Sequence, residues 1–464
     1  NFAVGLLVAK FLGPEEYGRY ALAFLAASML QWLLFEWIRA AALRFYSESN
    51  RLSHPEIRAT IDALFLTVAG VVIVGTLALW LSGVDLPAPP ALVAATIAVT
   101  IANAVYDFAS GLLRARFLDR SYAALVIVKN VLLFFFVVGG AWWFGSARVA
   151  LLGMVASIAG AVAIKARAVI DPAARLSMRQ WRLTAQFARY AWPICLGSLI
   201  YQSIPMLNRA LAAKWDGLAE AGQFALAFDI SIRILNAIGT SLDALLFQMA
   251  VRADTDHGPE AAGRQLAANI TIVAGTLLPT CAGLLLVLPS FEQIFVPQSF
   301  HGHFERYFLI VTPAVTIGAL TSFAINPIFQ VARRTVPLIV GGLVAGLANL
   351  VAIGFVPGMD GALDLAVAQL IAMAAGFLAV VVYGVVMKAF WPPARAMAAI
   401  LLATALMACA VWPLRGMTPG VVALVTQAFV GAAVYGALAT LFDIAGLRSV
   451  LLPRLAARLR NRGQ

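Results

Sequence analysis

Runs of 18 or more mostly apolar residues recur along the whole chain, and they limit the possible fold more than any other feature. A helix of about 20 apolar residues crosses the ~30 Å hydrocarbon core of a bilayer. Backbone polar groups find no water there, so isolated spans must be helices and not open strands. The sequence therefore predicts an all-α, polytopic membrane protein.

The composition agrees with this class. The chain of 464 residues is 62% hydrophobic and 12% charged, whereas soluble domains contain about 25% charged residues. A net charge of +11 would suggest a nucleic-acid partner in a soluble protein. In a membrane protein the basic residues mark cytoplasmic loops instead. We therefore expect a lipid bilayer around the chain and no nucleic acid.

Cysteine and histidine do not form a recognisable metal motif. The three cysteines lie in separate apolar runs, as buried free thiols do. His301 and His303 stand in one short loop without a third ligand. We therefore predict no metal and no cofactor, and the identity of a coupling ion stays open.

The apolar runs predict about fourteen transmembrane helices. The first run is too short to cross a membrane, and it lacks the basic start and cleavage site of a signal peptide. We interpret it as a first helix that is truncated in this sequence. The expected spans lie near residues 1–12, 18–39, 57–82, 90–113, 121–144, 147–167, 190–212, 219–250, 265–289, 304–330, 336–357, 362–387, 395–413 and 418–442.

A helix–turn–helix hairpin occurs twice. Residues 9–24 read AKFLGPEEYGRYALAF and residues 213–228 read AKWDGLAEAGQFALAF, so nine of sixteen positions are identical at an offset of 204 residues. Gly13 is suited to end one helix, and Pro14 is suited to begin the next. The same register also aligns Pro55 with Pro259. The sequence therefore predicts two copies of one long helical unit.

Basic residues predict the orientation. The loops after even-numbered spans, with the C-terminal tail, hold 24 of the 33 lysines and arginines, and the loops after odd-numbered spans hold seven. The even-numbered loops and both termini are therefore expected to be cytoplasmic. Six spans per copy make the repeats parallel, with a transport path expected at their interface. The expected domains are an N-terminal lobe (1–168), a basic cytoplasmic linker (169–189), a C-terminal lobe (190–389), two extra helices (390–443) and a basic cytoplasmic tail (444–464).

Two parallel sets of six helices, two further helices and the hairpin Leu12–Tyr20 resemble a known family. The chain is similar to the polysaccharide transporter branch (O-antigen or lipid-linked oligosaccharide flippases) of the multidrug/oligosaccharidyl-lipid/polysaccharide flippase superfamily. The resemblance extends to Tyr190-Ala191-Trp192-Pro193 and to Asn349, Pro357, Gly361 and Ala362. It implies two lobes around a central cavity lined mainly by helices 1, 2, 7 and 8. The implied function is a flippase that moves undecaprenyl-pyrophosphate-linked sugars to the outer leaflet.

The resemblance also implies a location and partners. Such a flippase lies in the bacterial inner membrane, takes lipid-linked oligosaccharide as its substrate and meets glycan polymerase and assembly proteins. One departure concerns the end of helix 7, where many relatives have an acid before the arginine and this chain has Asn208-Arg209. That departure disfavours an ion-coupling carboxylate at position 208.

Charged residues within the spans are the candidate site residues, because each costs roughly 2.5–3.5 kcal/mol to insert. Arg233 lies near the midplane of its span, about 20 Å along the helix at 1.5 Å per residue. Asp229 lies one turn earlier on the same face. Arg233 suits a pyrophosphate or an acidic sugar through its planar fork of donors. The two residues also fit a structural ion pair inside the bundle.

Further charged residues have two interpretations each. The repeat relates Arg39 to Asp243, so these two side chains are candidates for an inter-lobe gate at the cytoplasmic mouth. Alternatively, Arg39 lies at the membrane interface and pairs with Glu36 one turn earlier. Lys129 and Arg209, with Asn208, fit either cavity lining or interfacial anchoring. Asp107 fits a local partner of Arg114 on its own helix better than it fits a proton carrier.

The sequence favours a flippase that works by alternating access, and two other functions are less favoured. A drug or cation exporter of the same superfamily would favour an acidic cavity. A membrane glycosyltransferase or polysaccharide polymerase is the alternative from another class, and Asp254-Thr255-Asp256 matches its D-x-D pattern. No nucleotide-binding domain surrounds that match, and no catalytic triad or phosphate loop occurs. We therefore predict that the protein is not an enzyme.

Overall fold

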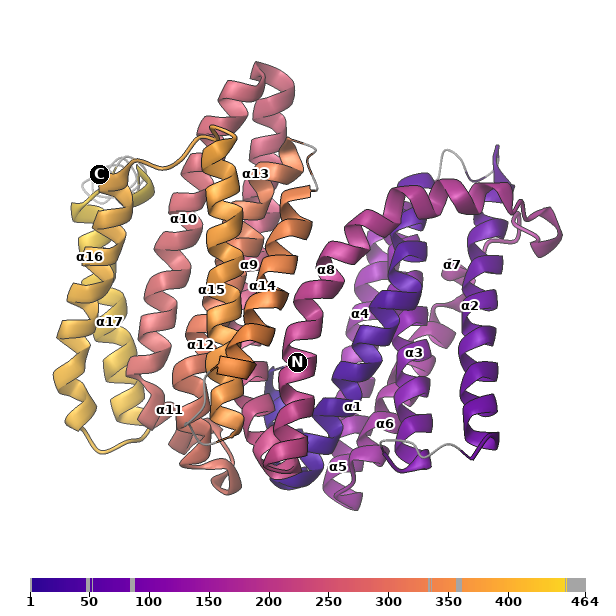
Figure 1. Ribbon diagram of the computed structural model, residues 1–464, viewed down its shortest axis with the longest axis horizontal. Helices are drawn as coiled ribbons and strands as arrows, with labels where there is room; N and C mark the ends of the chain where they lie inside the picture. Colours follow the sequence, from indigo (N-terminus) through magenta and orange to yellow (C-terminus); the bar gives the residue numbers. More distant parts are fainter. Residues whose placement is uncertain are drawn as a thin grey trace, which may run out of the picture. The chain divides into compact units, whose positions relative to one another are not determined.

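The computed structural model describes residues 2–46, 51, 53–83, 88–332, 334, 336–355, 361–446 and 448, and these residues form helices and no strands (Figure 1). Twelve helices in this part of the chain are long and apolar enough to cross a membrane. The longest, α1 (Phe2–Phe45), contains the first two predicted spans, and the less apolar α8 (Arg182–Trp215) covers the predicted span 190–212. The predicted all-α, polytopic fold is confirmed. Pro357 and most of the predicted tail lie outside the described residues.

The chain packs into two compact units, Asn1–Ala225 and Leu226–Gln464. Packing places α8 in the first unit, although the sequence repeat assigns the matching span to the second copy. The predicted lobe boundaries follow the sequence repeat and not the packing units, so they stay a prediction. Besides α1 and α8, the first unit contains α2 (Pro55–Leu81), α3 (Pro90–Ala115), α4 (Asp119–Leu133), η1 (Phe134–Val138), α5 (Gly139–Phe144), α6 (Ala147–Ile164), α7 (Ala166–Val169) and η2 (Leu176–Met178).

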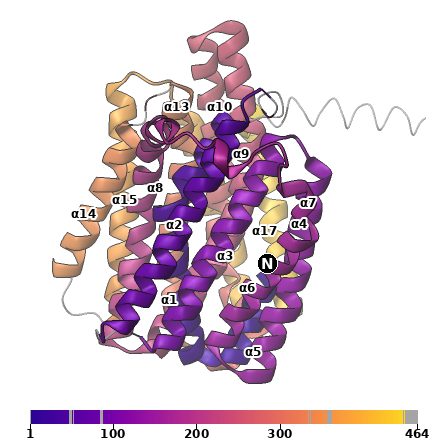
Figure 2. The same cartoon turned by 90° about the vertical axis from the view of Figure 1, so that its right-hand side faces the viewer.

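Within the first unit α1 is the central helix. It packs against α3, α6 and α8, while α4 packs against α6 (Figure 2). One core cluster joins α1, α2 and α3 through a row of aromatic rings, with centroids 5.1 Å apart for Phe35 and Phe65 and 4.9 Å apart for Phe65 and Phe108. The second half of α2 leaves Val71 and Val74 about two thirds exposed. Such an apolar helix face is suited to lipid.

The second unit begins within α9 (Leu218–His257), which starts in the first unit. In this unit α15 packs against α14 and α12, and α16 packs against α17 and α10. The unit contains α10 (Pro259–Leu286), α11 (Leu288–Phe295), η3 (Gln298–Phe300), α12 (His303–Leu320), η4 (Thr321–Ile325), α13 (Asn326–Val331), α14 (Val336–Phe355), α15 (Ala362–Val386), α16 (Ala394–Val411), η5 (Trp412–Gly416), α17 (Val421–Leu441) and η6 (Ile444–Gly446).

The hairpin turns of the two repeats have corresponding backbones. Gly13 has φ 70° and ψ 174°, a combination that is essentially restricted to glycine. Its counterpart at the same offset, Gly217, has φ 91°. Pro14 follows Gly13 directly and opens the longer segment of α1. The sequence prediction that glycine ends one helix and the next begins immediately is confirmed in both copies.

Candidate transport site

The two hairpin turns lie against each other inside the first unit. A β-carbon on Gly18 would be 2.0 Å from the carbonyl oxygen of Leu218, and one on Gly222 would be 2.1 Å from the carbonyl oxygen of Pro14. Gly18 corresponds to Gly222 in the repeat, and Pro14 corresponds to Leu218. Each turn therefore presents the same glycine to the same backbone position of the other turn. This reciprocal contact is the geometry of a local pseudo-twofold axis.

Polar side chains of α1 and α3 meet within the membrane-spanning part of the first unit. The amide nitrogen Nε2 of Gln31 donates to Oδ2 of Asp107 at 3.1 Å. The sequence instead predicted Arg114 as the partner of Asp107, but the Arg114 guanidinium lies over the Tyr122 ring, 5.8 Å from its centroid. Gln31 is 76 positions away from Asp107 in sequence, so no local pattern could reveal this contact.

The remaining charges of this region have partners within the first unit. Nε of Arg39 donates to Oε2 of Glu36 at 2.8 Å, and both residues are on α1. The Lys129 ammonium of α4 lies 4.3 Å from the centroid of the Tyr106 ring of α3. The structure therefore contains the pair of Arg39 and Glu36, which was the local interpretation of the sequence. The pairing of Arg39 with Asp243, which would join the two units, stays a prediction.

The predicted pair at the end of helix 7 is inside the protein. Asn208 and Arg209 of α8 are 0% and 2% exposed. A buried arginine needs hydrogen bonds to offset the loss of hydration. Their predicted role in a cavity stays a prediction.

Arg233 and Asp229 lie on α9 with half-buried side chains. Between them, Ser231 is fully buried, and its hydroxyl is 2.8 Å from the Thr312 hydroxyl of α12. The hydroxyl contact therefore links α9 to α12 at Ser231, and Arg233 lies two residues farther along α9. Asp243 lies farther along α9 and is also half-buried. Their roles toward a substrate stay predictions.

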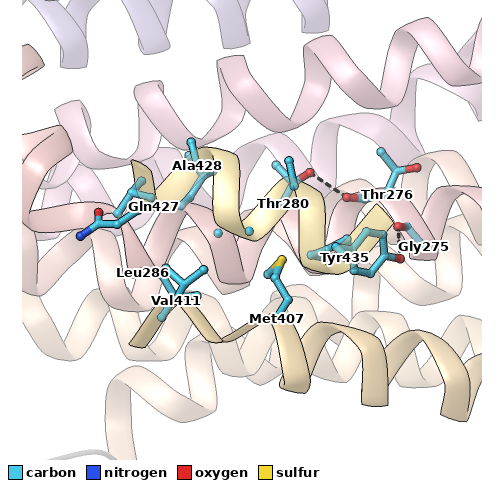
Figure 3. Close-up of a pocket in the computed structure, with 15 residues that line it drawn as sticks. Gly275, Thr276, Thr280, Leu286, Met407, Val411, Gln427, Ala428 and Tyr435 are labelled. Atoms are coloured by element: carbon cyan, nitrogen blue, oxygen red, sulfur yellow. Dashed lines mark hydrogen bonds between the residues drawn. The ribbon is translucent and has the colours of Figure 1, made fainter. Parts of the chain in front are cut away.

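A groove opens between α10, α16 and α17 of the second unit (Figure 3). It has a volume of about 440 Å³ and is mostly apolar, with Pro279, Met407 and Val411 in its wall. The Tyr435 hydroxyl at one end donates to the Gly275 carbonyl, and Nε2 of Gln427 donates to the Leu414 carbonyl at 2.9 Å. Two of the three helices are the extra ones beyond the repeats, so the sequence repeat gave no sign of this groove.

The segment that follows α1 is joined to the linker by a buried carboxylate. Asp171 accepts hydrogen bonds from the Tyr46 hydroxyl at 2.7 Å, from Nε of Arg51 at 3.0 Å and from the Ala173 amide at 3.1 Å. Burial alone would raise the pKa of Asp171, but these donors hold it below its ordinary value. Burial and the bond to Asp171 raise the pKa of Tyr46 to about 12. The linker is therefore fixed to the first unit.

The candidate residues do not form a metal site in the described part of the chain. There, no group of three His, Cys, Asp or Glu side chains is arranged to hold an ion. The structure instead offers polar groups within the membrane-spanning helices of both units, and the second unit also contains the mostly apolar groove between α10, α16 and α17.

Residues 2–247 match the family of polysaccharide biosynthesis proteins. Among solved structures, the lipid II flippase MurJ in an inward closed conformation matches 95% of this chain and 96% of its own, with 12% identity and a TM-score of 0.73. An inward-facing multidrug resistance MATE transporter of the MOP superfamily matches 83% of this chain and 93% of its own, with 14% identity and a TM-score of 0.61. The comparison with curated protein sequences gave no match.

Proposed function

We propose that this chain, which belongs to the family of polysaccharide biosynthesis proteins, is a flippase for lipid-linked oligosaccharide. Its substrate would be an undecaprenyl-pyrophosphate-linked unit of O-antigen or another surface polysaccharide. The protein would act in the bacterial inner membrane, with both termini in the cytoplasm, and would hand its product to glycan polymerase and assembly proteins. The family match, together with a fold shared with a lipid II flippase over 95% of the chain, carries this proposal.

The polar and apolar features suit the two parts of such a substrate. A diphosphate headgroup needs compensating donors within the bilayer, and the half-buried Arg233 of α9 would supply a guanidinium. A polyprenyl tail needs an apolar surface. The groove between α10, α16 and α17 supplies one within the membrane-spanning part of the second unit.

Expression in a strain that lacks its O-antigen flippase tests the proposal. We expect restored surface glycan and transfer of the lipid-linked intermediate from the inner to the outer leaflet, followed by a leaflet-selective probe. Continued accumulation of the intermediate in the inner leaflet, with the protein present at normal level in the membrane, would reject the proposal.

A drug or cation exporter is the second candidate, because the chain shares the fold of a multidrug transporter. The charges of the first unit argue against it: Glu36 and Asp107 are accompanied by Arg39 and Lys129. A cation would therefore meet no net negative charge in that cluster. Efflux of a cationic dye from the same strain, without glycan transfer, would support the exporter instead.

A further inference from the structure

The segment between α6 and α8 has an exposed surface that the proposed function does not use. It mixes large apolar side chains, which expose between 40% and 61% of their area, with exposed arginines. Exposed apolar groups of this size indicate a surface that meets something other than water. We name this surface the basic–apolar face and define it by Arg167, Ile170, Arg175, Leu176, Met178, Arg179, Trp181 and Arg182.

The basic–apolar face is held at the level where the transmembrane helices end. The Gln180 amide donates to Oγ1 of Thr60 at 2.8 Å, close to the start of α2. Nη2 of Arg58 donates to the Val169 carbonyl at 3.2 Å. Nη1 of Arg116, which follows α3, donates to the Ala168 carbonyl at 3.2 Å. Because α2 turns an apolar face outward, this level corresponds to the membrane interface.

The exposed charges of the segment between α6 and α8 are all positive. Residues 165–190 contain six basic residues and one acidic residue. The acid is Asp171, which is buried and already accepts from Tyr46 and Arg51. The arginines of the face therefore have no exposed carboxylate within the segment to neutralise them.

The apolar members have the chemistry of an interfacial anchor. Tryptophan is enriched at the boundary between headgroups and acyl chains. The Trp181 ring also has the Arg179 guanidinium 5.8 Å from its centroid, so a basic and an aromatic group reach the surface together. Amphipathic segments of this kind bind membranes through apolar burial and through attraction to anionic lipids.

We propose that the basic–apolar face docks onto the headgroups of anionic phospholipids in the membrane that surrounds the protein. The arginines bind lipid phosphates, and Ile170, Leu176, Met178 and Trp181 insert at the boundary of the acyl region. Since Asp171 ties the linker to α1, this lipid contact holds the start of α8 against the bilayer. Each arginine near such a surface strengthens docking about fivefold.

The test places an environment-sensitive fluorophore on Met178→Cys in the full chain, with Cys195, Cys281 and Cys409 replaced by alanine. The protein is reconstituted in phosphatidylcholine nanodiscs with or without phosphatidylglycerol. We expect blue-shifted emission, and quenching by headgroup-labelled lipid, only when phosphatidylglycerol is present. High salt should reverse both effects.

Charge removal gives the matched comparison. Replacing Arg175, Arg179 and Arg182 by glutamine should abolish most of the dependence on phosphatidylglycerol. The same three-charge change at Arg252, Arg264 and Arg306, which are exposed in the second unit, should leave it intact. Emission typical of water in every nanodisc, identical emission with and without phosphatidylglycerol, or equal losses in both triple variants would each overturn the proposal.

Discussion

Gly18 and Gly222 are the two described glycines at which an added methyl group would come nearest to neighbouring atoms. Each added β-carbon would lie about 2 Å from a backbone carbonyl oxygen, which cannot rotate away as a side chain can. We expect Gly18→Ala and Gly222→Ala to destabilise the protein by about 1–3 kcal/mol or more, because the turns must separate. Thermal unfolding in detergent measures this effect.

Gly70→Ala is the control, since a β-carbon there meets nothing within 4 Å. Helical alanine in open space is neutral or slightly stabilising. If Gly18→Ala unfolds at the same temperature as Gly70→Ala, the two turns do not make the contact described above.

Arg233 gives a second prediction at this scale. If it binds the diphosphate, Arg233→Ala should lower the transport rate about ten- to hundredfold, the usual effect of losing a charge-assisted hydrogen bond. Arg233→Lys should keep part of the rate, because the charge remains while the fork of donors is lost. The leaflet assay reports both variants, and the exposed Arg306→Ala serves as control. Normal transport by Arg233→Ala would exclude it from the substrate site.

At the scale of elements, Asp171 makes the connection between the linker and α1 dependent on pH. Its pKa is lowered in the folded protein. Its contribution to stability is therefore present above the unfolded value of about 3.9 and is lost as pH falls through the folded value. Asp171→Asn should reduce hydrogen-exchange protection of the linker by about 1–3 kcal/mol at pH 7, and this difference should shrink below about pH 4.

The exposed Asp256→Asn removes the same charge elsewhere and should change nothing in the linker. A difference between wild type and Asp171→Asn that persists undiminished at pH 3 would show that the buried carboxylate does not hold the linker.

The elements themselves were readable from the sequence, whereas their contacts were not. Apolar runs located the spans because a bilayer demands about 20 apolar residues per helix. The glycine turns were readable because few residues adopt their backbone angles. The hydrogen bond from Tyr46 to Asp171 joins residues 125 positions apart, and no periodicity encodes such a distance. The groove of α10, α16 and α17 was unreadable for the same reason, because it depends on how distant helices pack.

At the scale of the whole molecule, the two interpretations of Arg39 make different predictions. Nε of Arg39 already donates to Glu36, so we expect transport lost in Arg39→Asp to return when Glu36→Arg is added. Adding Asp243→Arg instead should not restore it. The leaflet assay compares the two double variants. Restoration by the Asp243 variant alone would establish the inter-lobe gate and reject the local pair.

The reciprocal contact of the hairpin turns bears on how such a chain arose. Gly18 touches the backbone of the second hairpin just as Gly222 touches that of the first. A surface that fits a copy of itself in this way is the interface of a symmetric dimer. Two separate, identical half-length chains would therefore have been able to meet through the same glycines. Gene fusion would then have joined an existing homodimer and kept the contacting glycines in both halves.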